Sequence, residues 1–189
     1  SSGMIELHAN ENPWPLPDDV RAKLAAAVAA VRLNRYPDGA GDAVKSALAR
    51  ALPLPEGAAL VLGNGSDELI QVITSAIARP GACVLAPDPT FVMYRIYAMQ
   101  AHVRYASVPL HADFTLDVEA LVAEIARQKP ALVWLASPNN PTGRAIPAAA
   151  IERVLAAAPG LVVVDEAYAD FAGTTLVPRV LEFPNLVVI

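Results

Sequence analysis

Short apolar runs alternate along the sequence with stretches whose apolar residues recur at helical spacing. Beyond residue 58 the runs have strand length, and Gly, Pro, Asn or Asp bounds them. Most are apolar throughout, which is typical of strands covered on both faces. We therefore predict strands at residues 59–62, 82–86, 103–108, 131–136, 161–164 and 186–189.

Helical patterns fill the intervals between these runs. Apolar residues recur at i, i+3, i+4 and i+7 from Val118 and again from Ile151, where Pro147 suits a first helical turn. A third helical face runs from Leu69 to Ile77. Such alternation of strands and helices predicts an α/β fold in which a mostly parallel sheet is flanked by helices.

The first 58 residues follow a different pattern. A proline-rich extended arm is expected over residues 10–17, a helix over 18–31, a turn over 34–39 and a second helix over 41–52. The residues before Met4 resemble a cloning remnant, and we exclude them from the fold. The predicted division is therefore 1–3 as remnant, 4–58 as arm and helices, and 59–189 as a sheet-containing domain.

Composition and charge exclude several classes of protein. The chain of 189 residues is 54% hydrophobic, which is enough for a substantial core, and its net charge of -5 argues against a nucleic-acid partner. No apolar run approaches the roughly 20 residues that cross a bilayer, and no signal peptide is visible. The single cysteine, Cys83, is expected to be a small core residue rather than a nucleophile. These features predict a cytoplasmic protein without membrane contacts.

The first of four polar patterns is Gly63-Asn-Gly-Ser-Asp-Glu68, which follows a predicted strand and opens a predicted helix. Glycines allow close backbone approach, and the first N–H groups of a helix attract an anion, for which phosphate is the natural guest. The alternative is a plain turn capped by Ser66. Glu68 stands where a dinucleotide-binding loop needs a third glycine, so that class is disfavoured.

The second and third patterns also follow predicted strands. In Asp88-Pro-Thr-Phe-Val-Met-Tyr94, Phe91 and Tyr94 could share a helix face, where an aromatic ring could stack on a planar cofactor or simply join the core. Ser137-Pro-Asn-Asn-Pro-Thr-Gly143 is a polar loop at the end of a sheet strand, where open α/β sheets bind ligands. Its Asn140 could donate to a phenolate oxygen.

The fourth pattern is a buried strand that ends in Asp165, Glu166, Ala167 and Tyr168. A carboxylate at that depth is costly unless it is paired, and the N–H of a pyridinium ring would pair it. Tyr168 could then reach another polar edge of the same ring. A metal site built on Asp165 and Glu166 is the alternative, but no further acidic residue or histidine is placed to complete it.

These four motifs, in this order and at these intervals, resemble the fold-type I aminotransferases that depend on pyridoxal phosphate (PLP). Asn10-Glu-Asn-Pro13 and Asn34-Arg-Tyr-Pro-Asp38 resemble the histidinol-phosphate aminotransferase branch in particular. The resemblance runs from residue 10 to residue 189. It implies an incomplete PLP-transferase fold of type I, with residues 4–58 belonging to the small domain and to dimer contacts.

The resemblance also implies a role for individual residues. Asn64, Gly65 and Ser66 would hold the cofactor phosphate. Around the ring, Phe91 would stack on one face, Asn140 and Tyr168 would bind the 3′ oxygen, and Asp165 would pair with the ring nitrogen. Tyr36 would reach the neighbour's cofactor across a homodimer interface, and Glu11, Asn12 and Trp14 would close over the substrate. No metal is expected.

The implied activity is transamination between L-histidinol phosphate and 2-oxoglutarate in histidine biosynthesis. It needs a Schiff-base lysine, which we expect downstream of Ile189 because Lys23, Lys45 and Lys129 occupy unsuitable positions. We therefore expect the 189-residue chain to be inactive and unstable by itself. A threonine-phosphate decarboxylase, an aromatic-amino-acid aminotransferase and a truncated non-catalytic PLP-binding module remain as alternatives.

Overall fold

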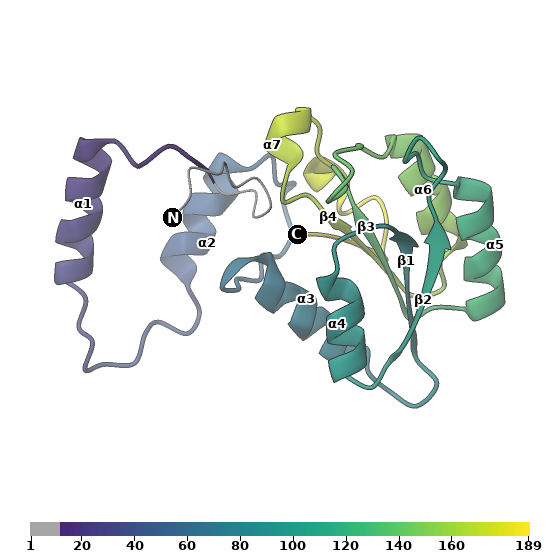
Figure 1. The fold of residues 1–189 in the computed structure, drawn as a ribbon. Coiled ribbons are helices and arrows are strands. Elements are labelled where there is room, and N and C mark those ends of the chain that lie inside the picture. Colours follow the sequence, from purple (N-terminus) through teal and green to yellow (C-terminus); the bar gives the residue numbers. More distant parts are fainter. Residues whose placement is uncertain (1–11) are drawn as a thin grey trace, which may run out of the picture. The chain divides into compact units, whose positions relative to one another are not determined.

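The computed structural model describes residues 12–189, and these divide into two units, one before residue 41 and one over Gly41–Ile189 (Figure 1). In the first unit, helix α1 spans Asp18–Ala29, close to the predicted 18–31, and has no buried residue. Its apolar side chains are largely exposed, including Val28 at 62%. No side chain of α1 is therefore part of a core formed by the described residues. The predicted boundary at residue 58 remains a prediction.

The second unit begins with helix α2, Asp42–Ala51, close to the predicted 41–52. Gly41 precedes this helix with φ +62, a left-handed conformation that favours glycine. A Cβ atom at this position would also lie 2.7 Å from Cδ1 of Leu62. The turn into α2 therefore requires glycine both for its backbone angle and for space.

Five parallel strands form the sheet of the second unit, in the order β2-β1-β3-β4-β5. They are β1 Cys83–Asp88, β2 Arg104–Pro109, β3 Leu132–Ala136, β4 Leu161–Asp165 and β5 Leu186–Val188. The predicted α/β fold and parallel sheet are confirmed. Because β2 lies on one side of β1 and β3 on the other, the strand order reverses there, and ligands of such sheets bind at this kind of switch point.

One predicted strand is wrong. Residues 59–62 have the composition of a strand but lie outside the sheet, and Val61 is 72% exposed. An apolar run becomes a strand only when a neighbour accepts and donates its backbone hydrogen bonds. Within residues 12–189, the five sheet strands pair only with one another, so this segment has no such neighbour.

Two helical layers cover the sheet (Figure 1). Helices α3 Gly65–Ala76 and α4 Met93–Gln100 lie on one face, and α5 Val118–Gln128 and α6 Ala148–Ala157 lie on the other. The short α7 Ala169–Ala172 and the 3-10 turn Val177–Arg179 follow β4. Successive side chains of a strand point to alternate faces of the sheet. Leu132, Trp134 and Val163 therefore pack toward α3 and α4. Val133 and Val162 pack toward α5 and α6.

Cys83 lies fully buried at the start of β1, as expected for a core residue. Burial raises the pKa of its thiol, which disfavours the reactive thiolate. Across residues 12–189, no helix is both long and apolar enough to cross a bilayer.

Candidate functional site

Two adjacent carboxylates at the end of β4 point to opposite faces of the sheet, Asp165 as the last residue of the strand and Glu166 directly after it. Asp165 is two residues from Val163 and therefore points to the α3/α4 face, where it is only 6% exposed. Glu166 points to the α5/α6 face, where its carboxylate accepts from the backbone N–H of Leu176 and the hydroxyl of Thr175. The two carboxylates therefore cannot bind one ion together, and no cluster of three His, Cys, Asp or Glu residues occurs among residues 12–189.

Both oxygens of Asp165 accept hydrogen bonds. Oδ2 accepts from the hydroxyl of Tyr94 at 2.7 Å, and Oδ1 accepts from the backbone N–H of Ala167 at 3.1 Å. Burial raises the pKa of Asp165, while the hydrogen bond from Tyr94 lowers it. Burial and the adjacent carboxylate raise the pKa of Tyr94 far above its usual value, so Tyr94 keeps its proton and remains the donor.

Tyr94 packs between two other aromatic rings, those of Trp134 and Phe91. Tyr94 is fully buried and stacks on Trp134, with ring centroids 4.8 Å apart and an interplanar angle of 1°. Phe91 meets Tyr94 edge-on at 5.7 Å. Sequence reasoning considered Tyr94 only as a stacking ring or a core aromatic and missed its contact with Asp165, although its spacing of three from Phe91 placed both near the same helix start.

One pocket at the carboxyl edge of the sheet collects five of the residues predicted for a cofactor site. Its lining consists of Ser66, Phe91, Tyr94, Ala136, Pro138, Asn140, Asp165, Ala167 and Tyr168. The residues come from the start of α3, the segment before α4, the loop after β3 and the end of β4. The pocket therefore lies at the switch point of the sheet, between β1 and β3, where the order of the strands reverses.

The loop before α3 differs in detail from its prediction. The N-cap of α3 is Asn64, not Ser66, and Gly65 opens the helix with φ +79. Glu68 fastens this loop, because its Oε2 accepts from both the backbone N–H and the side-chain amide of Asn64. No side chain caps the first helical N–H groups, so the turn capped by Ser66 is wrong. Ser66 instead lines the pocket, and Asn64 and Gly65 immediately precede it.

Asn139 was not predicted and joins the two loops that carry Phe91 and Asn140. Its side-chain amide donates to the carbonyl of Pro89 at 3.0 Å and to the Thr142 hydroxyl at 2.9 Å, and its carbonyl oxygen accepts from Thr90 at 2.7 Å. The residue is 7% exposed. Asn139 is next to Asn140 in the sequence, so the motif indicated the correct loop. It did not show that Asn140 faces the pocket while Asn139 holds the loop in place.

Four other predicted residues precede residue 41. Tyr36, Asn12 and Trp14 belong to the unit before residue 41, where Tyr36 is fully exposed and Trp14 is 80% exposed. The side-chain oxygen of Asn12 accepts from the backbone N–H of Trp14. Glu11 lies outside the described residues. The roles that the resemblance implies for these residues stay predictions.

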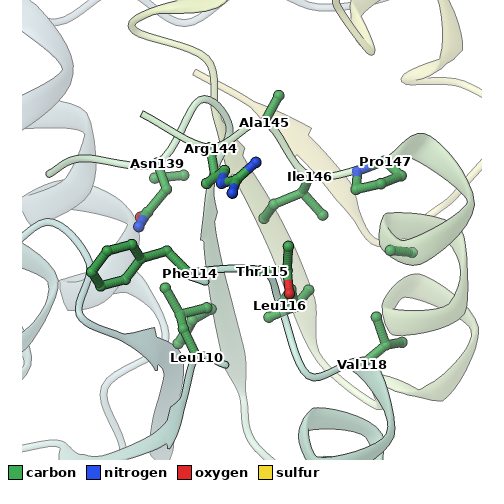
Figure 2. Close-up of a pocket in the computed structure, with 13 residues that line it drawn as sticks. Leu110, Phe114, Thr115, Leu116, Val118, Asn139, Arg144, Ala145, Ile146 and Pro147 are labelled. Atoms are coloured by element: carbon green, nitrogen blue, oxygen red, sulfur yellow. The ribbon is translucent and has the colours of Figure 1, made fainter. Parts of the chain in front are cut away.

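A second pocket of about 220 Å³ lies at the same edge of the sheet but on the α5/α6 face (Figure 2). Its wall is mainly aliphatic, with Leu110, Leu116 and Ile146 among the labelled residues, and Arg144 is its single charged side chain. The Nε of Arg144 donates to the carbonyl of Asp113. This pocket contains no carboxylate or phenol, and its one amide is that of Asn139.

A five-stranded parallel sheet with helices on both faces and a pocket at its switch point is a ligand-binding α/β fold. The chain belongs to the family described as aminotransferase class I and II, whose sequence profile matches residues 2–189. The resemblance inferred from the motifs is thereby confirmed at the level of the family and the fold.

Individual relatives agree with this assignment. The histidinol-phosphate aminotransferase of Chromobacterium violaceum is 50% identical over 188 residues, and histidinol-phosphate aminotransferase 1 of Burkholderia lata is 50% identical over 189 residues. In both cases the match covers 100% of this chain and 53% of the relative. The chain therefore spans about half the length of the curated relatives it matches.

Among solved structures, the histidinol-phosphate aminotransferase of Sinorhizobium meliloti, crystallised with pyridoxal-5′-phosphate, is similar with a TM-score of 0.77. The two sequences are 29% identical, and the match covers 92% of this chain and 47% of that chain. This likeness supports the fold that the sheet order and the two helical layers already define.

Proposed function

We propose that the full-length protein is a PLP-dependent transaminase that exchanges the amino group between L-histidinol phosphate and 2-oxoglutarate. The observation that carries the proposal is the buried Asp165 at the floor of a pocket that Phe91, Asn140 and Tyr168 also line. The similarity to two histidinol-phosphate aminotransferases supports this choice of substrate.

The chemistry of the pocket fits a pyridine cofactor. A carboxylate that is 6% exposed favours a cationic N–H partner, which a protonated ring nitrogen provides. Phe91 offers an aromatic surface for the ring. Asn140 supplies an amide donor and Tyr168 a phenol at the same pocket, and both suit an anionic ring oxygen. Ser66 and the uncapped N–H groups at the start of α3 suit a phosphate.

Each residue then has a defined task. When bound, PLP supplies an electron sink for the charge that develops at the substrate α-carbon. Asp165 holds the proton at the ring nitrogen, and Asn140 with Tyr168 fixes the opposite polar edge. Ser66 and the start of α3 anchor the phosphate and so set the position of the ring.

The proton at the α-carbon needs a separate base, for which we propose a lysine downstream of Ile189. The lysines of this chain support that placement. Lys129 ends α5 and lines a different pocket with Pro130 and Gly160, next to the amino ends of β3 and β4. Lys23 lies on the exposed helix α1 and pairs with Asp19, and Lys45 lies on α2.

Two further features belong to the same proposal. We propose a cytoplasmic homodimer in which Tyr36 contacts the neighbouring subunit's cofactor and Glu11, Asn12 and Trp14 close over the substrate. The full exposure of Tyr36 within its unit is compatible with a partner contact.

The first test is the intact mass of the full-length protein after incubation with dilute PLP and reduction with borohydride. One reduced PLP per chain is expected, because a Schiff-base lysine fixes the cofactor on reduction. A protein that binds no PLP, covalently or otherwise, would contradict the proposal. PLP held without a covalent adduct would instead favour the non-catalytic module.

The second test separates the possible reactions. Incubation of the full-length protein with L-histidinol phosphate and 2-oxoglutarate should produce L-glutamate. Release of carbon dioxide from threonine phosphate without any transamination would favour the decarboxylase. A strong preference for aromatic amino acids as donors would favour the aromatic aminotransferase.

A further inference from the structure

The buried hydroxyl of Tyr94 is not among the groups assigned to the cofactor or the substrate. It lies 2.7 Å from Oδ2 of Asp165, and the two residues are 71 positions apart in the sequence. Tyr94 is fully buried, so water does not compete for this hydrogen bond. A hydrogen bond to an ionised acceptor in such a place is stronger than one at the surface.

The ring of Tyr94 is held as firmly as its hydroxyl. One face lies parallel to Trp134, and Phe91 packs edge-on against it. Trp134 is itself fully buried in the central strand β3. Its indole N–H has no hydrogen-bond partner among the described residues, so packing alone keeps the indole in place. The fixed ring therefore directs the hydroxyl of Tyr94 toward Asp165.

We propose that Tyr94 is a positioning residue that, supported by Trp134, fixes the orientation of the Asp165 carboxylate and keeps its negative charge available to the ring nitrogen of the cofactor. Two hydrogen bonds then define the carboxylate plane, one from Tyr94 to Oδ2 and one from Ala167 to Oδ1. The inference rests on the proposed PLP function.

Loss of the hydroxyl has a definite consequence. Burial and the charge of Asp67 both disfavour the ionised form of Asp165, and the hydrogen bond from Tyr94 is the largest influence that opposes them. Without it, a proton shared between Asp165 and the ring nitrogen moves toward Asp165. The ring nitrogen then loses positive charge, although the shape of the pocket is unchanged.

The test uses the full-length protein loaded with PLP that is isotopically labelled at the ring nitrogen, observed by nitrogen NMR. Tyr94→Phe should shift the ring-nitrogen signal toward that of neutral pyridine and weaken PLP binding about tenfold. Tyr97→Phe is the matched control, since Tyr97 lies one turn further along α4 and should leave the signal unchanged. Thermal melting of each variant verifies that it folds.

Trp134→Leu is the second variant, because it keeps the hydroxyl of Tyr94 but removes the ring that supports it. A smaller shift of the ring-nitrogen signal in the same direction is expected. A folded Tyr94→Phe protein that binds PLP with the wild-type signal would overturn the inference and leave the proposed function intact. If Tyr94→Phe does not fold, an unshifted ring-nitrogen signal in Trp134→Leu would overturn the inference in the same way. Wild-type protein that binds no PLP would overturn both.

Discussion

The two faces of one sheet edge carry opposite kinds of pocket. On the α3/α4 face, the pocket contains a buried carboxylate, an amide and two phenols. On the α5/α6 face, the pocket in Figure 2 is mainly aliphatic with a single charged side chain, Arg144. Both pockets include Ala136, the last residue of β3. The end of β3 therefore contributes to both surfaces.

The difference shows how strictly the strand pleat assigns chemistry to a face. Asp165 and Glu166 are adjacent in the sequence, yet one is buried beside Tyr94 and the other accepts from Leu176 and Thr175 across the sheet. A pair of neighbouring acidic residues thus serves two separate purposes. Asp165 supplies charge to the candidate site, and Glu166 secures the chain that returns toward β5.

The largest expected effect is at this pair. Asp165→Ala should weaken PLP binding about a hundredfold, because removing one partner of a buried charge pair costs several kcal/mol. Glu166→Gln, on the opposite face, should change PLP affinity less than about twofold. Titration of both variants with PLP, followed by absorbance, measures the contrast. Equal losses of PLP affinity in the two variants would mean that the face on which a carboxylate lies does not determine its contribution to PLP binding.

The next effect concerns the residue that joins the loops of the polar pocket. Asn139→Ala should lower the free energy of unfolding by about 2 kcal/mol, because it leaves the buried partners at Pro89, Thr90 and Thr142 without their hydrogen bonds. PLP affinity should fall with it, since Phe91 and Asn140 lose their common anchor. Urea unfolding checks the first expectation. A variant as stable as wild type would show that the loops do not depend on Asn139.

A smaller effect should appear at the phosphate end. Ser66→Ala should weaken PLP binding about fivefold to tenfold, as expected for one lost hydrogen bond to an anion. Binding of pyridoxal, which lacks the phosphate, should be unaffected. If both ligands lose affinity equally, Ser66 contributes to the shape of the pocket rather than to phosphate binding.

The smallest effect is a pH dependence of stability without PLP. Burial raises the pKa of Asp165, so the folded chain holds this proton to higher pH than the unfolded chain does. Its contribution to stability is therefore greatest at low pH and falls as the pH rises from the ordinary Asp range through the raised folded value. Asp165→Asn cannot titrate and should resist urea better than wild type at neutral pH, with the advantage vanishing in acid. An advantage that grows in acid would have the wrong sign.

Most of the polar pocket could be predicted from the sequence. Local apolar runs predicted the five sheet strands, and the motifs after β1, β3 and β4 contain Phe91, Asn140, Asp165 and Tyr168. These residues meet in one pocket because the carboxyl ends of parallel strands lie at one edge. Ser66 lines the same pocket, although its motif follows residues 59–62, which are not a strand. The cofactor-binding roles of these residues stay predictions, and the aliphatic pocket was not predicted. The family resemblance added the chemistry that such a set of residues serves.

The remaining features depend on contacts between distant residues. Nothing near Tyr94 in the sequence indicates that its hydroxyl meets Asp165, and nothing near Asn139 indicates that it reaches Pro89 and Thr90. The segment 59–62 failed as a strand because pairing depends on a neighbour that local pattern cannot supply. The apolar spacing over residues 18–31 correctly predicted helix α1. It did not predict that the apolar side chains of this helix would be exposed.

We propose that the cofactor binds at the α3/α4 face of the sheet edge, with Asp165 at the base of its site. A crystal structure of the full-length protein grown with PLP would locate the ring. We expect the pyridine ring beside Phe91, with its nitrogen within hydrogen-bonding distance of Asp165 and its phosphate at Ser66. A ring bound in the aliphatic pocket near Arg144, or with its nitrogen directed away from Asp165, would contradict this proposal.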